Sequence, residues 1–136
     1  MNNFGAKAYQ KTSVATASKE KILLMLYEGA IQNLKKCKVA MEEKRIADKG
    51  VFLGKAQDII NELSNSLNFD VGGDLARQLE SLYLHIFEQS TQANISNDPN
   101  KLAHCIKLLE TLYSGWKEAV EKAKGTSSNT SIGERK

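Results

Sequence analysis

Proline and aromatic residues are scarce in the sequence. It contains one proline, and aromatic residues make up only 7% of the chain. Proline breaks the interior of a helix, so its scarcity leaves long segments that can be helical. Apolar and polar residues nowhere alternate as they do in a half-buried strand. With 136 residues, of which 41% are apolar, the chain is long enough for one domain with one contiguous core.

Long apolar runs are also missing. No stretch approaches the roughly 18–20 apolar residues that span a membrane, and residues 1–5 lack the charged and apolar regions of a secretory signal. We therefore expect a cytoplasmic protein without membrane insertion. Cys37 and Cys105 are the two cysteines, and they fit a compartment in which thiols stay reduced. Both fall beside predicted helical core positions, where free cysteines act as small hydrophobes.

Charge of one sign does not accumulate along the chain. The formal net charge is +3, and acidic and basic residues are mixed throughout. A nucleic-acid-binding domain carries a clustered basic face instead. The charge pattern therefore argues against a nucleic-acid partner.

Side chains that could support catalysis or hold a metal are scarce. His85 and His104 are the only histidines, they fall on separate predicted helices, and neither has a ligand four residues away. His85 and Glu88 form a single reversed pair, whereas a carboxylate-bridged site needs paired Glu-x-x-His motifs on two helices. His104 precedes Cys105, but adjacent residues of a helix do not face each other, so they cannot form a nucleophile–base pair. The pair Gly72-Gly73 is too short for a phosphate-binding loop. We expect no enzyme activity, no cofactor and no metal site.

The most informative segment that is present runs from Ala17 to Ala30. A polar cap, at Thr16 or Ser18, and a charged first turn precede six consecutive apolar residues. The resulting helix is apolar on nearly every face, whereas a simple two-layer contact needs one stripe about 100° wide. This helix must be central or covered from two sides.

Apolar residues at a spacing of three and four predict four helices, at about 18–43, 46–67, 74–94 and 99–124. Asn68 to Asp74 form a break, where the glycine pair supplies positive φ and Asp70 or Asp74 can cap the next helix. Asn97-Asp98-Pro99 is the sharpest boundary, with Asp98 as cap and Pro99 in the first helical position. The predicted core-facing residues of the helices include Leu26, Ile46, Leu75 and Leu109.

Four such helices with short connections predict an all-α fold, an antiparallel up-down-up-down four-helix bundle over residues 16–124. Residues 1–15 have no sustained period and predict an extended N-terminal arm. Gly125 is expected to end the last helix. Residues 125–136 are rich in Ser, Thr and Asn, and they predict a disordered C-terminal tail.

The helices carry more apolar residues than one stripe each requires. The second helix has an additional ridge, and the fourth helix has Leu108 and Tyr113 outside its stripe. The ridge consists of Phe52, Ala56, Ile59 and Leu63. One interpretation is a wide core face that takes up all of these residues. The other is an exposed groove that accepts an amphipathic helix from a partner.

Several motifs, in order and at family spacing, resemble the flagellin-specific export chaperones of the FliS family. The resemblance covers roughly residues 6 to 121. The motifs are Ala8-Tyr9-Gln10, Ala17 to Ala30, Lys55 to Leu63, Ser66 to Phe69, Gly72-Gly73, Ser81-Leu82-Tyr83, Asn97-Asp98-Pro99 and Trp116 to Ala119.

The resemblance implies a cytosolic chaperone that binds the C-terminal segment of flagellin, prevents premature polymerisation and delivers it to the flagellar type III export gate. It also implies that the arm with Tyr9 packs on the bundle in the free state and moves when flagellin binds. The predicted partner-binding residues are Tyr9, Phe52, Ala56, Ile59, Leu63 and Leu108. The alternative is a structural or regulatory bundle that oligomerises through the apolar ridge, and self-association without flagellin is a further expectation.

Overall fold

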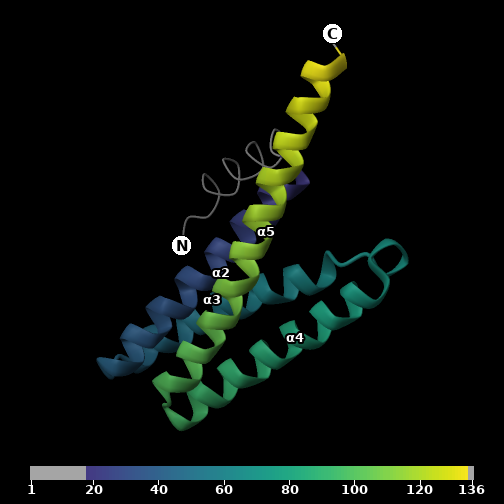
Figure 1. Ribbon diagram of the computed structural model, residues 1–136. Coiled ribbons are helices and arrows are strands. Elements are labelled where there is room, and N and C mark those ends of the chain that lie inside the picture. The colour runs from purple at the N-terminus through teal and green to yellow at the C-terminus, as the bar shows by residue number, and fades with distance from the viewer. Residues whose placement is uncertain (1–17, 135–136) are drawn as a thin grey trace, which may run out of the picture.

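The computed structural model describes residues 18–134, with side chains as far as Lys124, and these residues form four helices without a strand (Figure 1). The helices are α2 (Lys19–Glu42), α3 (Ile46–Asn65), α4 (Phe69–Ser96) and α5 (Pro99–Glu134). Helix α2 packs against α3 and α5, and α4 packs against the same two helices. The chain therefore forms the antiparallel four-helix bundle that the sequence predicts.

Local capping chemistry sets the helix boundaries. The Ser18 hydroxyl oxygen accepts a hydrogen bond from the Lys21 amide at 3.1 Å and begins α2. Asn97 ends α4 in the left-handed conformation, with φ of 53°. The Asp98 carboxylate then accepts from the Asn100 amide at 3.0 Å, and Pro99 occupies the first position of α5. These three boundaries confirm the sequence-based assignments.

The sequence predicts a break before the third helix, but in the structure this break lies inside α4. The cap is Asn68, whose side-chain oxygen accepts from the Asp70 and Val71 amides at 3.1 Å each, and not Asp70 or Asp74 as predicted. One helical turn follows, and Gly73 interrupts it with φ of 51° and ψ of −124°. A glycine adopts this conformation without the steric penalty of a side chain. The apolar residues after Asn68 are thereby held on a turn at the end of the bundle.

The core is one cluster contributed by all four helices. Its largest fully buried side chains are Tyr27, Tyr83, Leu34, Met41, Ile60, Leu63, Ile86, Leu102 and Leu109. Among the predicted core residues, Leu109 is fully buried and Leu26 is half-buried. Ile46 and Leu75 are exposed, which corrects the prediction for both. Ile46 is the first residue of α3, and Leu75 follows the break at Gly73, so both lie where neighbouring helices do not cover them.

A polar contact fixes the position of α3 against α4. The Gln57 side-chain amide donates to the Ser90 hydroxyl at 3.1 Å and to the Thr91 hydroxyl at 2.8 Å. Ser90 is fully buried and donates in turn to the Phe87 carbonyl at 2.8 Å. Because an unpaired buried hydroxyl is unfavourable, sliding of one helix along the other would be disfavoured.

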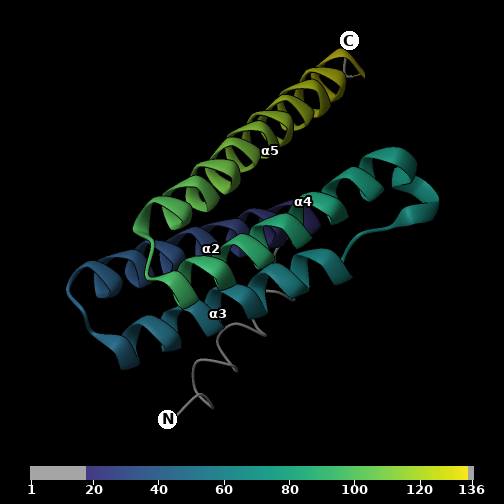
Figure 2. The same cartoon turned by 90° about the horizontal axis from the view of Figure 1, so that it is seen from below.

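Helix α5 extends beyond its predicted end. It continues through Gly125 to Glu134, so the helix end predicted at Gly125 is wrong. A single glycine destabilises a helix by only about 1 kcal/mol relative to alanine. From the connection at residues 97–98, α5 and α4 spread apart in both views (Figures 1 and 2). The predicted arm, residues 1–15, lies outside the described residues.

Candidate partner-binding grooves

An apolar groove lies at the end of the bundle where α2 begins and α3 connects to α4. It has a volume of about 310 Å³, and its walls come from α2, α4, α5 and the connection between α3 and α4. We call it the end groove, and it is lined by Leu23, Ser66, Leu67, Asn68, Val71, Gly72, Leu75, Ala76, Leu79, Tyr83 and Trp116. Few of these side chains are polar, so the groove suits an apolar ligand surface.

Tyr83 and Trp116 in the wall of the end groove are tied to the core by hydrogen bonds. The Trp116 indole N–H donates to the Tyr27 hydroxyl at 3.1 Å, and the Tyr27 and Tyr83 hydroxyl oxygens lie 2.5 Å apart. Burial raises the pKa of both tyrosines, so both phenols stay protonated near neutral pH. These bonds hold the rings of Tyr83 and Trp116 in fixed positions.

The rim of the end groove carries large apolar side chains that face solvent. Val71 is 86% exposed and Leu75 is 54% exposed. Phe69, on the same capped turn as Val71, is 39% exposed. A concentration of apolar surface around an apolar groove is typical of an interaction site.

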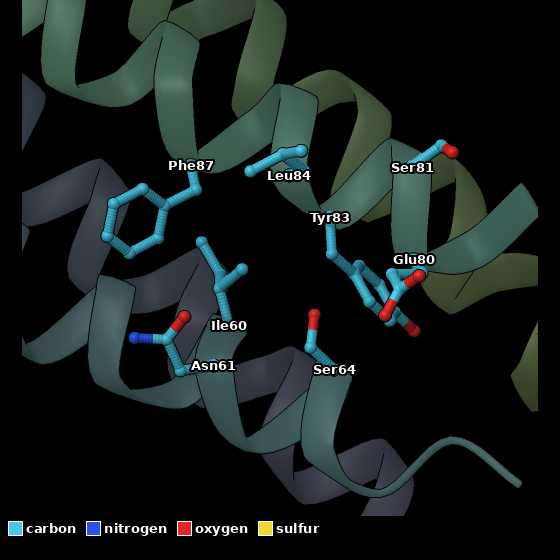
Figure 3. Close-up of a pocket in the computed structure, with 8 residues that line it drawn as sticks. All are labelled: Ile60, Asn61, Ser64, Glu80, Ser81, Tyr83, Leu84 and Phe87. Atoms are coloured by element: carbon cyan, nitrogen blue, oxygen red, sulfur yellow. The ribbon is translucent and has the colours of Figure 1, made fainter. Parts of the chain in front are cut away.

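A second groove of about 370 Å³ lies between α3 and α4. Figure 3 shows Ile60 and Ser64 extending from α3 toward α4, with Tyr83 and Phe87 on the opposite side. Tyr83 lines this α3/α4 groove and the end groove, so the two are adjacent. Leu84, at 57% exposure, adds apolar surface at its edge.

The structure separates the residues predicted to bind a partner. Ala56 and Leu63 are fully buried, so their predicted place on an exposed ridge is wrong. Together with Leu53 and Ile60 they form the buried stripe of α3, with a spacing of three, four and three residues. The exposed ridge therefore does not exist as a continuous feature.

The other predicted partner-binding residues lie outside the two grooves or outside the described part of the chain. Phe52, Ile59 and Leu108 are half-buried against the core, and none of them lines the end groove or the α3/α4 groove. Tyr9 lies outside the described residues. Partner binding by these four residues stays a prediction.

Sequence reasoning missed two features of the end groove. The sequence predicts that Val71 belongs to the break and that Leu75 faces the core. The signal available was an apolar residue within a glycine-rich capped turn, since Val71 and Leu75 flank the glycine pair. Their exposure depends on the interruption at Gly73, which the apolar period alone does not reveal.

The side chains described offer little for catalysis. The His85 and His104 rings lie 5.9 Å apart, edge to face, across α4 and α5. No group of three or more potential metal ligands occurs within the described part of the chain. Cys37 and Cys105 are buried, and burial raises the pKa of both thiols. None of the helices, over the residues described, is apolar enough along its length to cross a bilayer.

Residues 1–123 match the family model of the flagellar protein FliS. The chain belongs to the FliS family. It is 43% identical over 114 residues to the flagellar secretion chaperone FliS of Vibrio cholerae, covering 81% of this chain and 84% of that protein. It is 33% identical to the FliS of Salmonella typhimurium, covering 88% and 92% of the two chains, and 33% identical to that of Bacillus subtilis, covering 84% of each.

A solved structure described as a flagellar chaperone from bacteria has the same fold. It superimposes with a TM-score of 0.72 at 24% identity, covering 87% of this chain and 98% of the other. FliS is a family of flagellar secretion chaperones and not of enzymes. The family agrees with the resemblance in the sequence and with the apolar grooves of the bundle.

Proposed function

We propose that this protein binds the C-terminal segment of flagellin in the cytoplasm, keeps it from polymerising and delivers it to the flagellar export gate. The observation that carries the proposal is the end groove with its exposed apolar rim, in a chain of the flagellar secretion chaperone family. A segment that polymerises through apolar helical faces would find comparable apolar surface there.

A bound amphipathic helix would lie across the end groove and the adjacent α3/α4 groove, which share Tyr83. A bound helix would place apolar residues at spacings of three and four against Leu75, Leu79 and Tyr83. Its polar face would remain in water, on the side turned away from these apolar residues. The wall is already fixed by the hydrogen bonds of Tyr83 and Trp116, so binding orders few chaperone side chains.

The test is a calorimetric titration of the full chain with a flagellin C-terminal peptide. Leu75→Asp places a charge on the rim without opening the core, because Leu75 is 54% exposed. We expect the variant to bind the peptide at least tenfold more weakly. Trp116 is the only tryptophan, so its emission provides a second readout of groove occupancy.

Ile95→Asp is the matched control. Ile95 lies on the same helix, is 73% exposed and lies near the other end of the bundle, away from both grooves. The control should bind the peptide as the unmodified chain does. If Leu75→Asp and Ile95→Asp bind equally well, the end groove is not the flagellin site.

Self-association without flagellin would use the same surface. Val71 and Leu75 would be covered by a second copy when the peptide is absent. Sedimentation velocity of the unmodified chain should then show a concentration-dependent larger species that the peptide dissociates. A monomer at every concentration would contradict self-association and would leave the flagellin proposal intact.

A further inference from the structure

A second candidate surface lies between α2 and α3, near the connection of these two helices. Lys35, Lys36, Val39, Arg45 and Phe52 line a cavity of about 250 Å³ there. We call these residues together with Lys55 the lysine–phenylalanine patch. The α2–α3 connection lies at the opposite end of the bundle from the end groove (Figure 1). The two surfaces share no residue.

The floor of the patch is apolar and accessible. Phe52 is half-buried, and Val39 beside it is 46% exposed. Two ammonium groups approach the Phe52 ring, Lys36 at 5.7 Å and Lys55 at 5.9 Å from its centroid. Cations at this distance are attracted to the ring face. The arrangement holds two positive charges over one apolar site.

The positive charge of the patch is only partly neutralised within the chain. Lys35 pairs with Glu110 at 3.1 Å on α5. Arg45 pairs with two carboxylates, Glu43 at 2.8 Å and Asp48 at 2.7 Å.

Lys36 and Lys55, which lie over the Phe52 ring, differ from Lys35 and Arg45 in having no such partner within the described part of the chain. Among the side chains described, Lys36 and Lys55 have no carboxylate within ion-pair distance. A ligand can therefore engage both ammonium groups without breaking an existing ion pair.

We propose that the lysine–phenylalanine patch binds an acidic segment of a second protein partner. An apolar side chain of that segment lies against Val39 and Phe52, and carboxylates on either side meet Lys36 and Lys55. This interaction goes beyond the flagellin-binding function. Because the patch and the end groove lie at opposite ends, the bundle can hold both ligands at once.

Charge complementarity decides the kind of partner. Carboxylates near two uncompensated ammonium groups accelerate association and fix the register of the ligand. Two cations flanking an aromatic ring give a short site, whereas binding to nucleic acid uses many phosphate contacts. An anionic membrane surface would likewise need a longer cluster of basic residues. The observations therefore favour a short acidic and apolar peptide.

The probe is a fluorescein-labelled peptide of about 14 residues, roughly four helical turns, with leucine at every fourth position and glutamate at the positions between. It is titrated by fluorescence anisotropy into the full chain. A peptide with glutamine in place of every glutamate serves as the uncharged comparison. We expect the acidic peptide to bind, the glutamine peptide to bind at least tenfold more weakly, and added salt to weaken binding of the acidic peptide.

The variant is Lys36→Glu combined with Lys55→Glu, and it should weaken binding of the acidic peptide at least tenfold. The control is Lys117→Glu combined with Lys122→Glu on α5, which changes the net charge equally, and Lys117 directly follows Trp116 of the end groove rather than lying at the patch. Lys36→Gln with Lys55→Gln should give an intermediate loss. Leu75→Asp should leave binding of the acidic peptide unchanged, so this test and the flagellin test fail independently.

Several outcomes overturn the proposal. Equal losses in the patch variant and the α5 control show that only net charge matters. Equal binding of the acidic and glutamine peptides removes the role of the lysines. Tighter binding of a single-stranded oligonucleotide or of phosphatidylserine vesicles than of the acidic peptide assigns the patch to a different ligand.

Discussion

The hydroxyl oxygens of Tyr27 and Tyr83 lie 2.5 Å apart in the core and join α2 to α4. The Trp116 indole N–H donates to Tyr27 at 3.1 Å and adds α5. Helices α2 and α4 are not among the main packed pairs of the bundle, so this contact connects helices that lie diagonally. Tyr83 and Trp116 also line the end groove, and the proposed ligand site is thereby coupled to the core.

Replacing Tyr27 by phenylalanine should destabilise the bundle more than the same change at Tyr83. Tyr27→Phe leaves both the Trp116 N–H and the Tyr83 hydroxyl without their partner, at about 1–3 kcal/mol for the buried Tyr83 hydroxyl and less for the half-buried Trp116 N–H. Tyr83→Phe removes one bond and leaves Tyr27 still bonded to Trp116. Urea denaturation, monitored by circular dichroism, measures the free energy of unfolding of both variants. Equal midpoints would mean that the Trp116 bond contributes nothing.

The stability of the bundle should fall steeply above about pH 10, the ordinary pKa of tyrosine. Burial raises the pKa of Tyr27 and Tyr83 in the folded chain. Above pH 10 the unfolded chain therefore binds fewer protons than the folded chain, and the free energy of unfolding falls by up to about 1.4 kcal/mol per pH unit for each tyrosine. The contribution is fully present below pH 10 and is lost as pH rises toward the folded pKa.

Denaturation of the unmodified chain and of the Tyr27→Phe, Tyr83→Phe double variant between pH 8 and 11 isolates this effect. The double variant should show a shallower decline, while lysine and cysteine deprotonation acts on both proteins alike. Parallel declines would show that the two phenols do not cause the pH dependence.

Both cysteines should resist thiol reagents while the protein is folded. Cys37 and Cys105 are fully buried, and burial raises the pKa of Cys105 to about 11. The thiolate is the reactive form, so exposure and ionisation are both missing at pH 8. In denaturant, both thiols should react with an aromatic disulfide reagent within the mixing time. In buffer, both should react only as fast as the folded protein opens. Fast reaction of the native protein at either thiol would contradict the burial.

Local signals in the sequence predicted the boundaries of the bundle well. Ser18, Asp98 and Pro99 act through their own backbone neighbours, so their roles do not depend on tertiary structure. The four-helix bundle follows from four segments with a helical apolar period and from the short connections between them. Even the family could be inferred, because its motifs keep their order and spacing.

The candidate sites depend on tertiary structure and were harder to predict. The buried stripe of α3 passes through Leu53, Ala56, Ile60 and Leu63, and it includes Ala56 and Leu63, which the sequence places on the additional ridge. A period of 3.6 residues allows either choice until the positions of α2 and α4 are known. The partner of the Tyr27 hydroxyl is 56 residues away, and no local pattern indicates it.

Truncating two leucines should separate full from partial burial. Leu109 is fully buried, and Leu109→Ala should destabilise the fold by about 2–5 kcal/mol, the range for buried leucine. Leu26 is only half-buried beside the core, so Leu26→Ala should have a smaller effect. Chemical denaturation compares them directly. An equal or larger effect at Leu26 would show that another surface covers this side chain in solution.

Gly29 on α2 lies against the Ile59 side chain of α3. A Cβ atom built on Gly29 would lie 3.0 Å from the Cδ1 atom of Ile59. Alanine is favoured over glycine in a helix by about 1 kcal/mol, but this contact is too short without movement of the Ile59 side chain. We expect Gly29→Ala alone to change the free energy of unfolding by less than about 0.5 kcal/mol, since the two effects oppose each other.

Ile59→Val removes the Cδ1 atom and should reverse this balance. In the Ile59→Val background, Gly29→Ala should stabilise the bundle by about 1 kcal/mol, so the two substitutions should be non-additive by roughly 0.5–1.5 kcal/mol. A double-mutant cycle from denaturant midpoints measures this coupling. Gly54→Ala provides the control, because a Cβ atom there has no neighbour within 4 Å, and it should stabilise equally in both backgrounds. Additive effects at Gly29 would mean that the Ile59 side chain rotates away freely, and that the close approach of α2 and α3 does not require glycine.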